Sequence, residues 1–352
     1  MKQHWWKILA VLILFYTFFV GLLVPLKPGV IAVSPDSAKS GEEVRLEIQG
    51  YNTNFLKGSK DIRAWLKIGE DRSIPSNNIL VKGDELMYAF FQLPNFLPVE
   101  APVTEVSLII DNPIDGAFVL PSAIFASQDQ VNANQGKLLW RTGNINGLHE
   151  LDQMTYPFRN ILQESIRNMY FHVPLWFGMI IILLGAVYCS ARYLSSGNRL
   201  HDMQAVALTQ VGVVFGLLGL LTGAIWAKYT WNAWWSFDVK QNMSAIAVLI
   251  YMAYFVLRSS FEDIEKQSRL GAVYNIFAFA ALIPLLFIIP RLTDSLHPGN
   301  GGNPGFGGED LDNTMRMVFY PAIIGWTLLG VWMAQLKLRT EQLQERLSWD
   351  DA

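Results

Sequence analysis

The sequence predicts an α-helical polytopic membrane protein, with about six transmembrane helices and an inserted extracytoplasmic all-β sandwich domain. Two observations lead to this fold class. Hydrophobic residues make up 51 % of the chain and charged residues only 16 %, whereas soluble domains carry about 25 % charged residues. In addition, long apolar stretches recur before position 27 and after position 167, whereas apolar and polar residues alternate between these positions.

Six apolar stretches approach the length of about 20 residues that a helix needs to cross a bilayer. They cover residues 8–26, 173–190, 204–226, 243–257, 273–290 and 317–336. The fourth is the shortest. The first follows Lys2 and Lys7, as in a signal peptide, but it is long and has no small-x-small cleavage pattern. We therefore expect it to remain as an anchor.

Lysines and arginines near these stretches predict the orientation of the chain. They gather at the N-terminus, in the loops after the second and fourth stretches, and in the C-terminal tail: Lys2, Lys7, Arg192, Arg199, Arg258, Lys266, Arg269, Lys337, Arg339 and Arg346. With an even number of spans, these four regions and both termini lie in the cytoplasm. The other connections then lie outside.

Alternation of apolar and polar residues predicts strands in the region after the first stretch. The strand candidates are residues 43–48, 61–68, 87–93, 105–110 and 117–120. Prolines and glycines separate them, as in an antiparallel, immunoglobulin-like sandwich. About 100 residues are enough for such a domain to have its own core.

These patterns divide the chain into five parts. We expect an N-terminal transmembrane anchor over residues 1–28, an extracytoplasmic β-sandwich over 29–125, a linker over 126–170 with a short helix near 158–167, a second transmembrane domain over 171–340 with a tryptophan-rich loop over 226–240, and a cytoplasmic tail over 341–352.

An aromatic cluster lies between the third and fourth apolar stretches, on the predicted outer face. Four of the twelve tryptophans fall within residues 226–235. A single tryptophan at a membrane end is usually an interfacial anchor, but so many flat rings in one segment indicate a surface for a large planar ligand, and haem is the obvious one. The predicted cofactor-binding residues are Trp226, Lys228, Trp231, Trp234, Trp235, Phe237, Asp238 and Lys240.

The charged residues of this segment suit the two propionates of a porphyrin. Lys228 and Lys240 offer the positive charge that carboxylates need. Asp238 has two equally weighted interpretations: it orients a neighbouring donor, or it caps the helix that follows.

Two histidines lie near the ends of other apolar stretches on the same outer face. His172 precedes the second stretch and His297 follows the fifth. A lone histidine near a membrane surface is usually a solvated polar residue, but a pair of neutral imidazoles can occupy both axial positions of a haem iron. His149 is a weaker candidate because it lies in the polar linker, and His4 and His201 fall on the cytoplasmic side.

Several function classes are disfavoured by the composition. The single cysteine, Cys189, leaves no Cys-x-x-Cys-His site for covalent haem attachment, so the chain is not a c-type cytochrome. A net charge of −3 argues against a nucleic-acid partner. The sequence has no phosphate-binding loop of an ATPase and no visible nucleophile–base pair or metal cluster. We therefore expect a binding and transfer protein, not an enzyme.

The segment from Thr222 to Asp238 closely resembles the tryptophan-rich signature of the haem-handling proteins of cytochrome c biogenesis. Within that superfamily, the run from Tyr170 to Pro174 and the loop around His297 resemble haem exporter protein C, also called cytochrome c maturation protein C. The resemblance covers about residues 166 to 340. Ala227 and Asn232 stand where that pattern usually has glycines, and Phe237 where it usually has tryptophan. The inserted sandwich is not part of the family pattern.

The resemblance implies a protein of the bacterial inner membrane that holds b-type haem non-covalently and transiently on the periplasmic side, with His172 and His297 as axial ligands. It also implies that this haem is presented to a periplasmic haem chaperone, in a complex with ABC-transporter subunits and a small membrane partner.

Three alternatives account for less of the sequence. The haem-lyase or cytochrome c synthetase branch shares the tryptophan segment, but that branch resembles a channel with further histidines inside its spans, and this chain shows none there. A membrane-anchored extracytoplasmic binding protein leaves the aromatic cluster unexplained. A permease or ion-coupled transporter would have charged residues deep within its spans, and these are sparse here.

Overall fold

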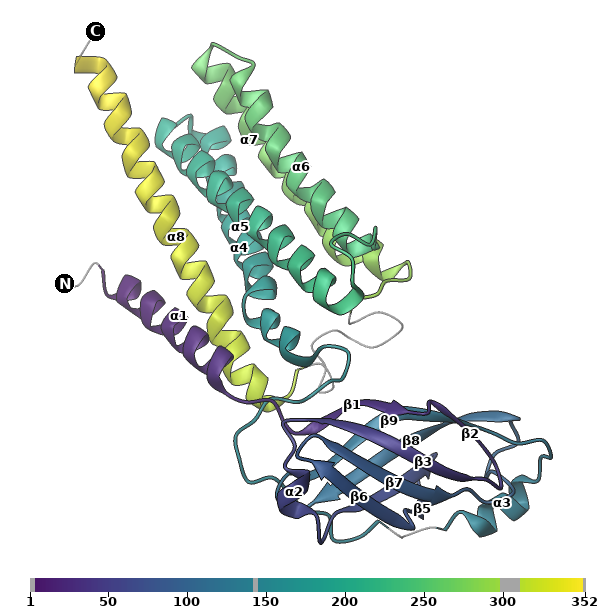
Figure 1. Ribbon diagram of the computed structural model, residues 1–352. Helices are drawn as coiled ribbons and strands as arrows, with labels where there is room; N and C mark the ends of the chain where they lie inside the picture. Colours follow the sequence, from purple (N-terminus) through teal and green to yellow (C-terminus); the bar gives the residue numbers. More distant parts are fainter. Residues whose placement is uncertain (1–3, 142–144, 298–310, 351–352) are drawn as a thin grey trace. The chain divides into compact units, whose positions relative to one another are not determined.

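The computed structural model describes residues 4–141, 145–297 and 311–350 (Figure 1). The chain divides into two compact units. One comprises residues 25–164, and the other joins residues 1–24 with residues 165–352. The first unit is rich in strands and the second in long helices.

The strand-rich unit contains two sheets. Its strands are β1 (Gly29–Ser34), β2 (Ser37–Lys39), β3 (Glu43–Tyr51), β4 (Arg63–Ile68), β5 (Arg72–Pro75), β6 (Asn78–Gly83), β7 (Leu86–Gln92), β8 (Val103–Asn112) and β9 (Gly116–Ser127). The strand order is β1-β3-β7-β6 in one sheet and β2-β9-β8-β4-β5 in the other. All pairings are antiparallel except that of β2 with β9, which is parallel.

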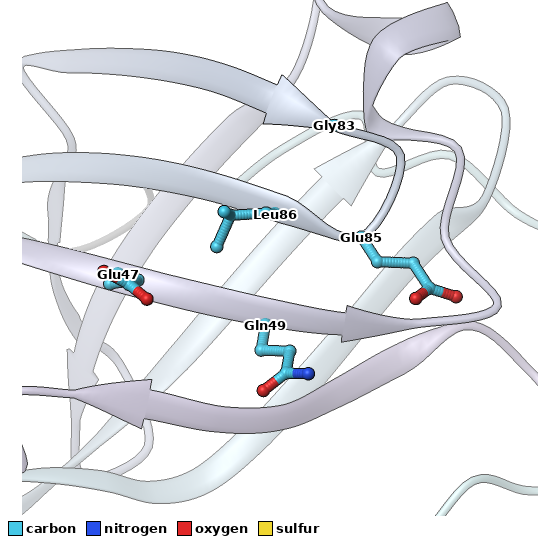
Figure 2. Close-up of a pocket in the computed structure, with 5 residues that line it drawn as sticks. All are labelled: Glu47, Gln49, Gly83, Glu85 and Leu86. Atoms are coloured by element: carbon cyan, nitrogen blue, oxygen red, sulfur yellow. The ribbon is translucent and has the colours of Figure 1, made fainter.

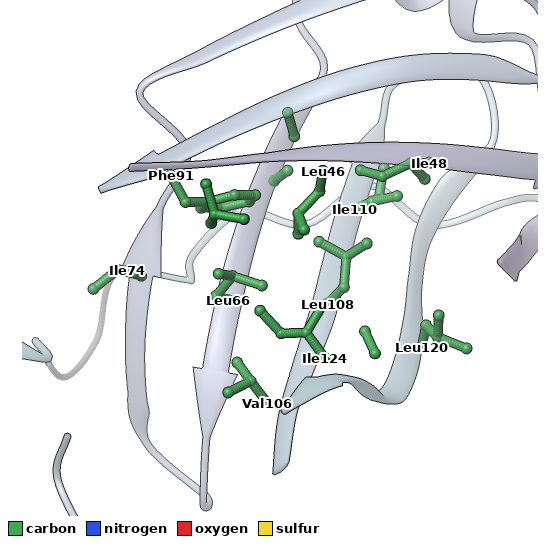
Figure 3. Packing of buried hydrophobic residues seen from close by; sticks show 14 of the residues in the cluster. Leu46, Ile48, Leu66, Ile74, Phe91, Val106, Leu108, Ile110, Leu120 and Ile124 are labelled. Atoms are coloured by element: carbon green, nitrogen blue, oxygen red, sulfur yellow. The ribbon is translucent and has the colours of Figure 1, made fainter. Parts of the chain in front are cut away.

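Side chains from both sheets meet in one buried core (Figure 3). Leu46 and Phe91 come from the four-stranded sheet, and Leu66, Leu108 and Ile124 from the five-stranded sheet; all five are 0 % exposed. Burying a side chain of this size stabilises a fold by about 1.5–3 kcal/mol. The alternation in the sequence therefore reflects one face of each strand turned toward this core.

The structure confirms the five predicted strands and adds four others. The confirmed strands β3, β4, β7, β8 and β9 occupy the interior of the two sheets, whereas β1, β2, β5 and β6 are their edges. Edge strands are short and only partly covered, so their apolar alternation is weak. The unit also contains two short helices, α2 (Phe55–Gly58) and α3 (Ala133–Leu139), and is thus β-rich but not all-β.

The region predicted as a linker has more structure than expected. Strand β9 continues to Ser127, α3 follows it, and the chain up to residue 164 clusters with the sheets. The helix expected near residues 158–167 is a 3₁₀ helix that begins only at Gln163 and ends at Tyr170. The side chain of Arg167 in this helix donates to the backbone oxygens of Gly21 (3.0 Å) and Val24 (2.7 Å) at the C-terminus of the first helix.

In the part of the helical unit that the structure describes, six helices are long and apolar enough to cross a membrane, as the sequence predicted. They are α1 (Trp5–Leu23), α4 (His172–Ser196), α5 (Arg199–Trp231), α6 (Val239–Ser259), α7 (Ile264–Ile283) and α8 (Asn313–Asp350). Four of them, α4, α5, α7 and α8, extend at least five residues past the apolar stretches at one end. Helix α5 continues through Trp231, so only residues 232–238 of the predicted tryptophan-rich loop are non-helical, and α8 includes most of the predicted tail.

Helices α4 and α5 pack closely because α5 presents glycines to α4. A Cβ atom at Gly219 would lie 2.8 Å from the ring of Trp176, and one at Gly223 would lie 2.8 Å from the ring of His172. Small residues at such contacts let membrane helices approach each other. The glycines thus make room for two large side chains at the beginning of α4.

The end of α7 is distorted. Pro284 has no backbone N–H to continue the helical hydrogen bonds, and the chain passes through a π turn (Pro284–Ile288) and a 3₁₀ turn (Ile289–Arg291). Both turns lie against α6. This change of direction leads the following residues toward the beginning of α6.

At the opposite end of the bundle, a buried ion pair links three helices. Asp202 of α5 accepts two hydrogen bonds from Arg258 of α6, at 2.7 and 2.9 Å, and one from Ser268 of α7 at 2.7 Å. Arg199 adds a further contact to the same carboxylate at 2.5 Å. Because Asp202 is 2 % exposed, these donors compensate a charge that could not otherwise be buried there.

Candidate functional site

The predicted ligand-binding residues gather at one end of the helical bundle. His172 is the first residue of α4, Trp226 and Trp231 lie in the last two turns of α5, Asp238 precedes α6, and His297 follows the distorted end of α7. Residues from three separate apolar stretches are therefore brought together, as the sequence predicted from its alternating topology.

Asp238 holds the beginning of α6 and the His297 loop at the same time. Its Oδ1 accepts from the backbone N–H of Lys240 at 2.8 Å, which caps α6. The same carboxylate accepts from the backbone N–H of Leu296 at 2.7 Å and from Nδ1 of His297 at 2.8 Å. The structure therefore shows both of the roles that the sequence left open.

Burial and neighbouring groups shift the pKa values of both Asp238 and His297. Burial alone raises the pKa of Asp238, but the N–H of Leu296 and the neighbouring His297 outweigh it, so the pKa lies below its ordinary value. Burial is the main cause that lowers the pKa of His297, and Lys240 adds to it, while Asp238 opposes it only in part. A neutral imidazole is the form that binds a metal.

His172 is fixed by α5. Its Nδ1 lies 3.0 Å from the backbone oxygen of Gly219 and 3.1 Å from Oγ1 of Thr222. A carbonyl oxygen can only accept a hydrogen bond, so Nδ1 carries the proton of the neutral ring. The missing side chain of Gly223 leaves space for the ring beside α5.

The two imidazoles therefore have the same arrangement. In each, Nδ1 donates to a fixed oxygen, of Gly219 for His172 and of Asp238 for His297. In neither does Nε2 have a hydrogen-bond partner among the residues that the structure describes. Ligating histidines in proteins typically donate their other ring N–H to a carboxylate or a carbonyl. Both rings are thus prepared to bind a metal through Nε2.

The aromatic residues divide into a packed group and an exposed group. The rings of Trp226 and Trp231 lie 4.9 Å apart, and their centroids are 5.6 and 4.8 Å from that of His297. Trp235 donates its Nε1–H to Oδ1 of Asn242 at 3.1 Å. By contrast, Trp234 is 59 % and Phe237 78 % exposed. The packed rings provide an apolar surface beside His297, and the exposed rings remain accessible from outside the protein.

The two predicted lysines have different surroundings. Nζ of Lys228 donates to Oδ1 of Asn232 at 2.9 Å and to its backbone oxygen at 3.3 Å, at the C-terminus of α5. Asn232 has a φ of 57° and ends that helix in the left-handed conformation. Lys240 lies in the first turn of α6 and acts electrostatically on His297.

The other histidines are not brought to this end of the bundle. His149 belongs to the strand-rich unit, where its Nδ1 lies 2.9 Å from Oδ2 of the buried Asp111. The imidazole of His201 contacts Oγ of Ser196, and His4 precedes α1. Among the described residues there is no group of three or more His, Cys, Asp or Glu side chains that could hold a metal ion.

The role of residues that act through packing is not evident from the sequence. Gly219, Thr222 and Gly223 position His172, and although Thr222 and Gly223 begin the tryptophan-rich segment, nothing in the sequence links them to this histidine. Gln241 was also not singled out: its Oε1 accepts from the backbone N–H (2.9 Å) and Oγ (3.0 Å) of Ser236, and its buried Nε2 has no hydrogen-bond partner among the described residues. A polar residue on the inward face of α6 was the signal that could have found it.

The strand-rich unit has an open pocket of about 460 Å³ on the four-stranded sheet (Figure 2). It is lined by Glu47, Gln49, Gly83, Glu85 and Leu86. The pocket contains neither histidines nor aromatic rings, and therefore does not have the chemistry of the site in the helical unit.

Fold and site together define a multi-pass membrane protein with two preoriented imidazoles beside packed tryptophans at one end of its bundle. Residues 153–351 match the family described as Heme exporter protein C, and the chain belongs to that family. The predicted resemblance is thereby confirmed.

Curated relatives with the same description share about a quarter of their residues with this chain over the matched region. The Heme exporter protein C of Paracoccus denitrificans is 26 % identical over 184 residues, which cover 52 % of this chain and 76 % of the relative. That of Escherichia coli K12 is 22 % identical over 188 residues, or 53 % and 75 % of the two chains. That of Haemophilus influenzae is 25 % identical over 184 residues, or 52 % and 73 %.

Proposed function

We propose that the protein binds b-type haem non-covalently at the outer face of the bacterial inner membrane and presents it to a periplasmic haem chaperone during cytochrome c maturation. Membership of the Heme exporter protein C family supports haem handling. The observation that carries the proposal is the pair of histidines, His172 and His297, each with Nδ1 hydrogen-bonded to a fixed oxygen and Nε2 without a described partner.

The residues of the site fit haem. His172 and His297 would serve as axial ligands of the iron, and bound haem would supply the porphyrin that is handed on. Trp226 and Trp231 would cover the apolar rings of the porphyrin and exclude water. Lys228 and Lys240 would place positive charge near the propionates.

Transfer requires that the haem remain within reach of a partner. Trp234 and Phe237 are exposed, and in this proposal they contact the chaperone or the edge of the porphyrin during transfer. The chaperone then competes for the iron ligands. Moderate affinity suits this role better than very tight binding, and the protein acts as a carrier without catalysing a reaction.

The proposal also places the strand-rich unit in the periplasm. We propose that its two sheets form an immunoglobulin-like sandwich on the outer side, with both chain termini in the cytoplasm. In this arrangement the unit either docks the chaperone or the apocytochrome or serves as a plain spacer. The helical unit would assemble in the lipid bilayer with ABC-transporter subunits and a small membrane partner, and no nucleic acid is involved.

The experiment that tests haem binding is an absorption spectrum of the detergent-purified protein, oxidised and reduced. It is recorded beside the double variant His172→Ala/His297→Ala and a matched control, His201→Ala, at the opposite end of the bundle. We expect a low-spin haem spectrum in the wild type and the control, and its loss in the double variant. Equal haem content and spectra in all three would refute the ligand assignment, and no haem uptake by the wild type would refute haem binding.

A further inference from the structure

Gln241, in the first turn of α6, is a buried side chain at the same end of the bundle as the two histidines, and only half of its hydrogen-bonding capacity is used. The residue is 7 % exposed. Its Oε1 accepts both the backbone N–H and the hydroxyl of Ser236. Its Nε2, which carries two N–H donors, is buried and has no partner in the part of the chain that the structure describes. Leaving such a donor buried and unpaired is unfavourable, because the water that would otherwise pair with it is excluded.

The packing of α5 against α6 shows where this donor lies. A Cβ atom at Gly216 of α5 would lie 2.8 Å from Cγ2 of Val248 of α6, so these two residues are at the same level of the bundle. The helices run in opposite directions. Two turns further along α5 is Gly223, and two turns back along α6 is Gln241. Residues seven apart share a helix face, so Gln241 faces α5 at the level of Gly223.

That level of the bundle is also the level of His172. The space that a side chain at Gly223 would occupy is taken by the imidazole of His172. On the other side, Asp238, which precedes Gln241 by less than one turn, holds His297. These contacts place Gln241 at the end of the bundle that holds both imidazoles, on the side of α6 that faces α5.

The chemistry of the proposed ligand identifies an acceptor for this amide. The four pyrrole nitrogens of haem are occupied by iron, and the two propionate carboxylates are the strong hydrogen-bond acceptors on its periphery. Resting on the proposed haem-binding function, we infer that Nε2 of Gln241 donates to a haem propionate. A hydrogen bond to a carboxylate is about twice as strong as one between neutral groups, so the bond would offset the cost of the unpaired amide in the empty protein.

The test compares haem with haem dimethyl ester, in which both propionates are esterified and uncharged. The variant Gln241→Glu retains an oxygen that can accept from Ser236 but replaces the donor with a negative charge. The matched control is Asn242→Asp, because the amide of Asn242 already donates to the backbone oxygen of Phe237 at 2.8 Å. Affinities of the full-length protein in detergent are measured by titration of the Soret absorbance.

We expect Gln241→Glu to bind haem about tenfold or more weakly than the wild type, and to bind the dimethyl ester within about threefold of the wild type. Asn242→Asp should change both affinities by less than Gln241→Glu changes that for haem. An equal loss for haem and ester, or no loss for either, would overturn the inference while leaving haem binding intact. A wild type that binds neither porphyrin would overturn the proposed function and this inference with it.

Discussion

The contact between Gly223 and His172 gives a sharp prediction for the substitution Gly223→Ala. The new Cβ atom would lie 2.8 Å from Cε1 of His172 and 3.4 Å from its Nδ1. Carbon atoms in favourable contact are about 3.5–4.0 Å apart, so the ring must move by roughly 1 Å or the helices must separate. Either movement strains the 3.0 Å hydrogen bond from Nδ1 to Gly219.

The size of the effect follows from this displacement. Metal–ligand distances tolerate changes of only about 0.2 Å, and loss of an orienting contact typically lowers metal affinity about 10–100-fold. We therefore expect Gly223→Ala to bind haem about 10–100-fold more weakly. Overpacking of this kind costs about 1–3 kcal/mol, partly offset by the roughly 0.5–1 kcal/mol that alanine gains over glycine in a helix.

Gly185→Ala is the matched control, because Gly185 lies in the same α4–α5 interface but its Cβ would lie at an ordinary 3.5 Å from Leu208. This variant should keep the haem affinity of the wild type and be equally or slightly more stable. The assay is a haem titration followed by Soret absorbance, with thermal unfolding in detergent. Wild-type haem affinity in Gly223→Ala would refute the positioning of His172 by α5.

Two further predictions concern buried carboxylates. Asp238→Asn keeps a good helix cap but weakens the hold on His297, so a haem titration should show about 10–100-fold lower affinity with little change in melting temperature; unchanged affinity would contradict the orienting role. In the strand-rich unit, burial alone raises the pKa of Asp111, but hydrogen bonds from His149 and Arg63 keep it below its ordinary value of 3.8. The ionised form therefore stabilises the fold at neutral pH, and this contribution is lost as the pH falls through the lowered pKa. The protection factors of the sheet amides, obtained from hydrogen exchange relative to the intrinsic rate at each pH, should fall on acidification in the wild type and much less so in Asp111→Asn; the same acid response in both would refute this account, and Asp129→Asn, at an exposed ion pair with Lys39, is the control.

The strands that the sequence predicts are those with one face buried in the core. The inner strands have one face against the core, so residues such as Leu46 and Leu108 recur at every second position. The edge strands β1, β2, β5 and β6 have a weaker pattern, because part of their surface faces solvent, and the sequence did not reveal them. Hydropathy located all six long helices, but it placed the end of α5 at Trp226 because Lys228 and the aromatic residues after it are not apolar enough to continue the pattern.

The candidate site was predictable where it rests on residue chemistry. Flat aromatic rings and imidazoles are rare enough that Trp226, Trp231, His172 and His297 stood out, and the positive-inside pattern predicted that they share one face. Asp238 stood out as well, but its role remained open because a carboxylate before a helix can act as a cap whether or not it also binds a side chain from a distant loop.

By itself, the sequence determined the family of the protein and its candidate membrane spans, and it predicted a set of residues for binding a planar, metal-containing ligand, because hydropathy and side-chain chemistry are local properties. Only the tertiary structure decided how those residues are held. Three features of the site arise only because helices α4, α5 and α6 pack together. They are the hydrogen bond from His172 to the carbonyl of Gly219, the space that Gly223 leaves for the same ring, and the buried amide of Gln241. Contacts of this kind depend on the relative level of separate helices, which no local pattern in the chain encodes.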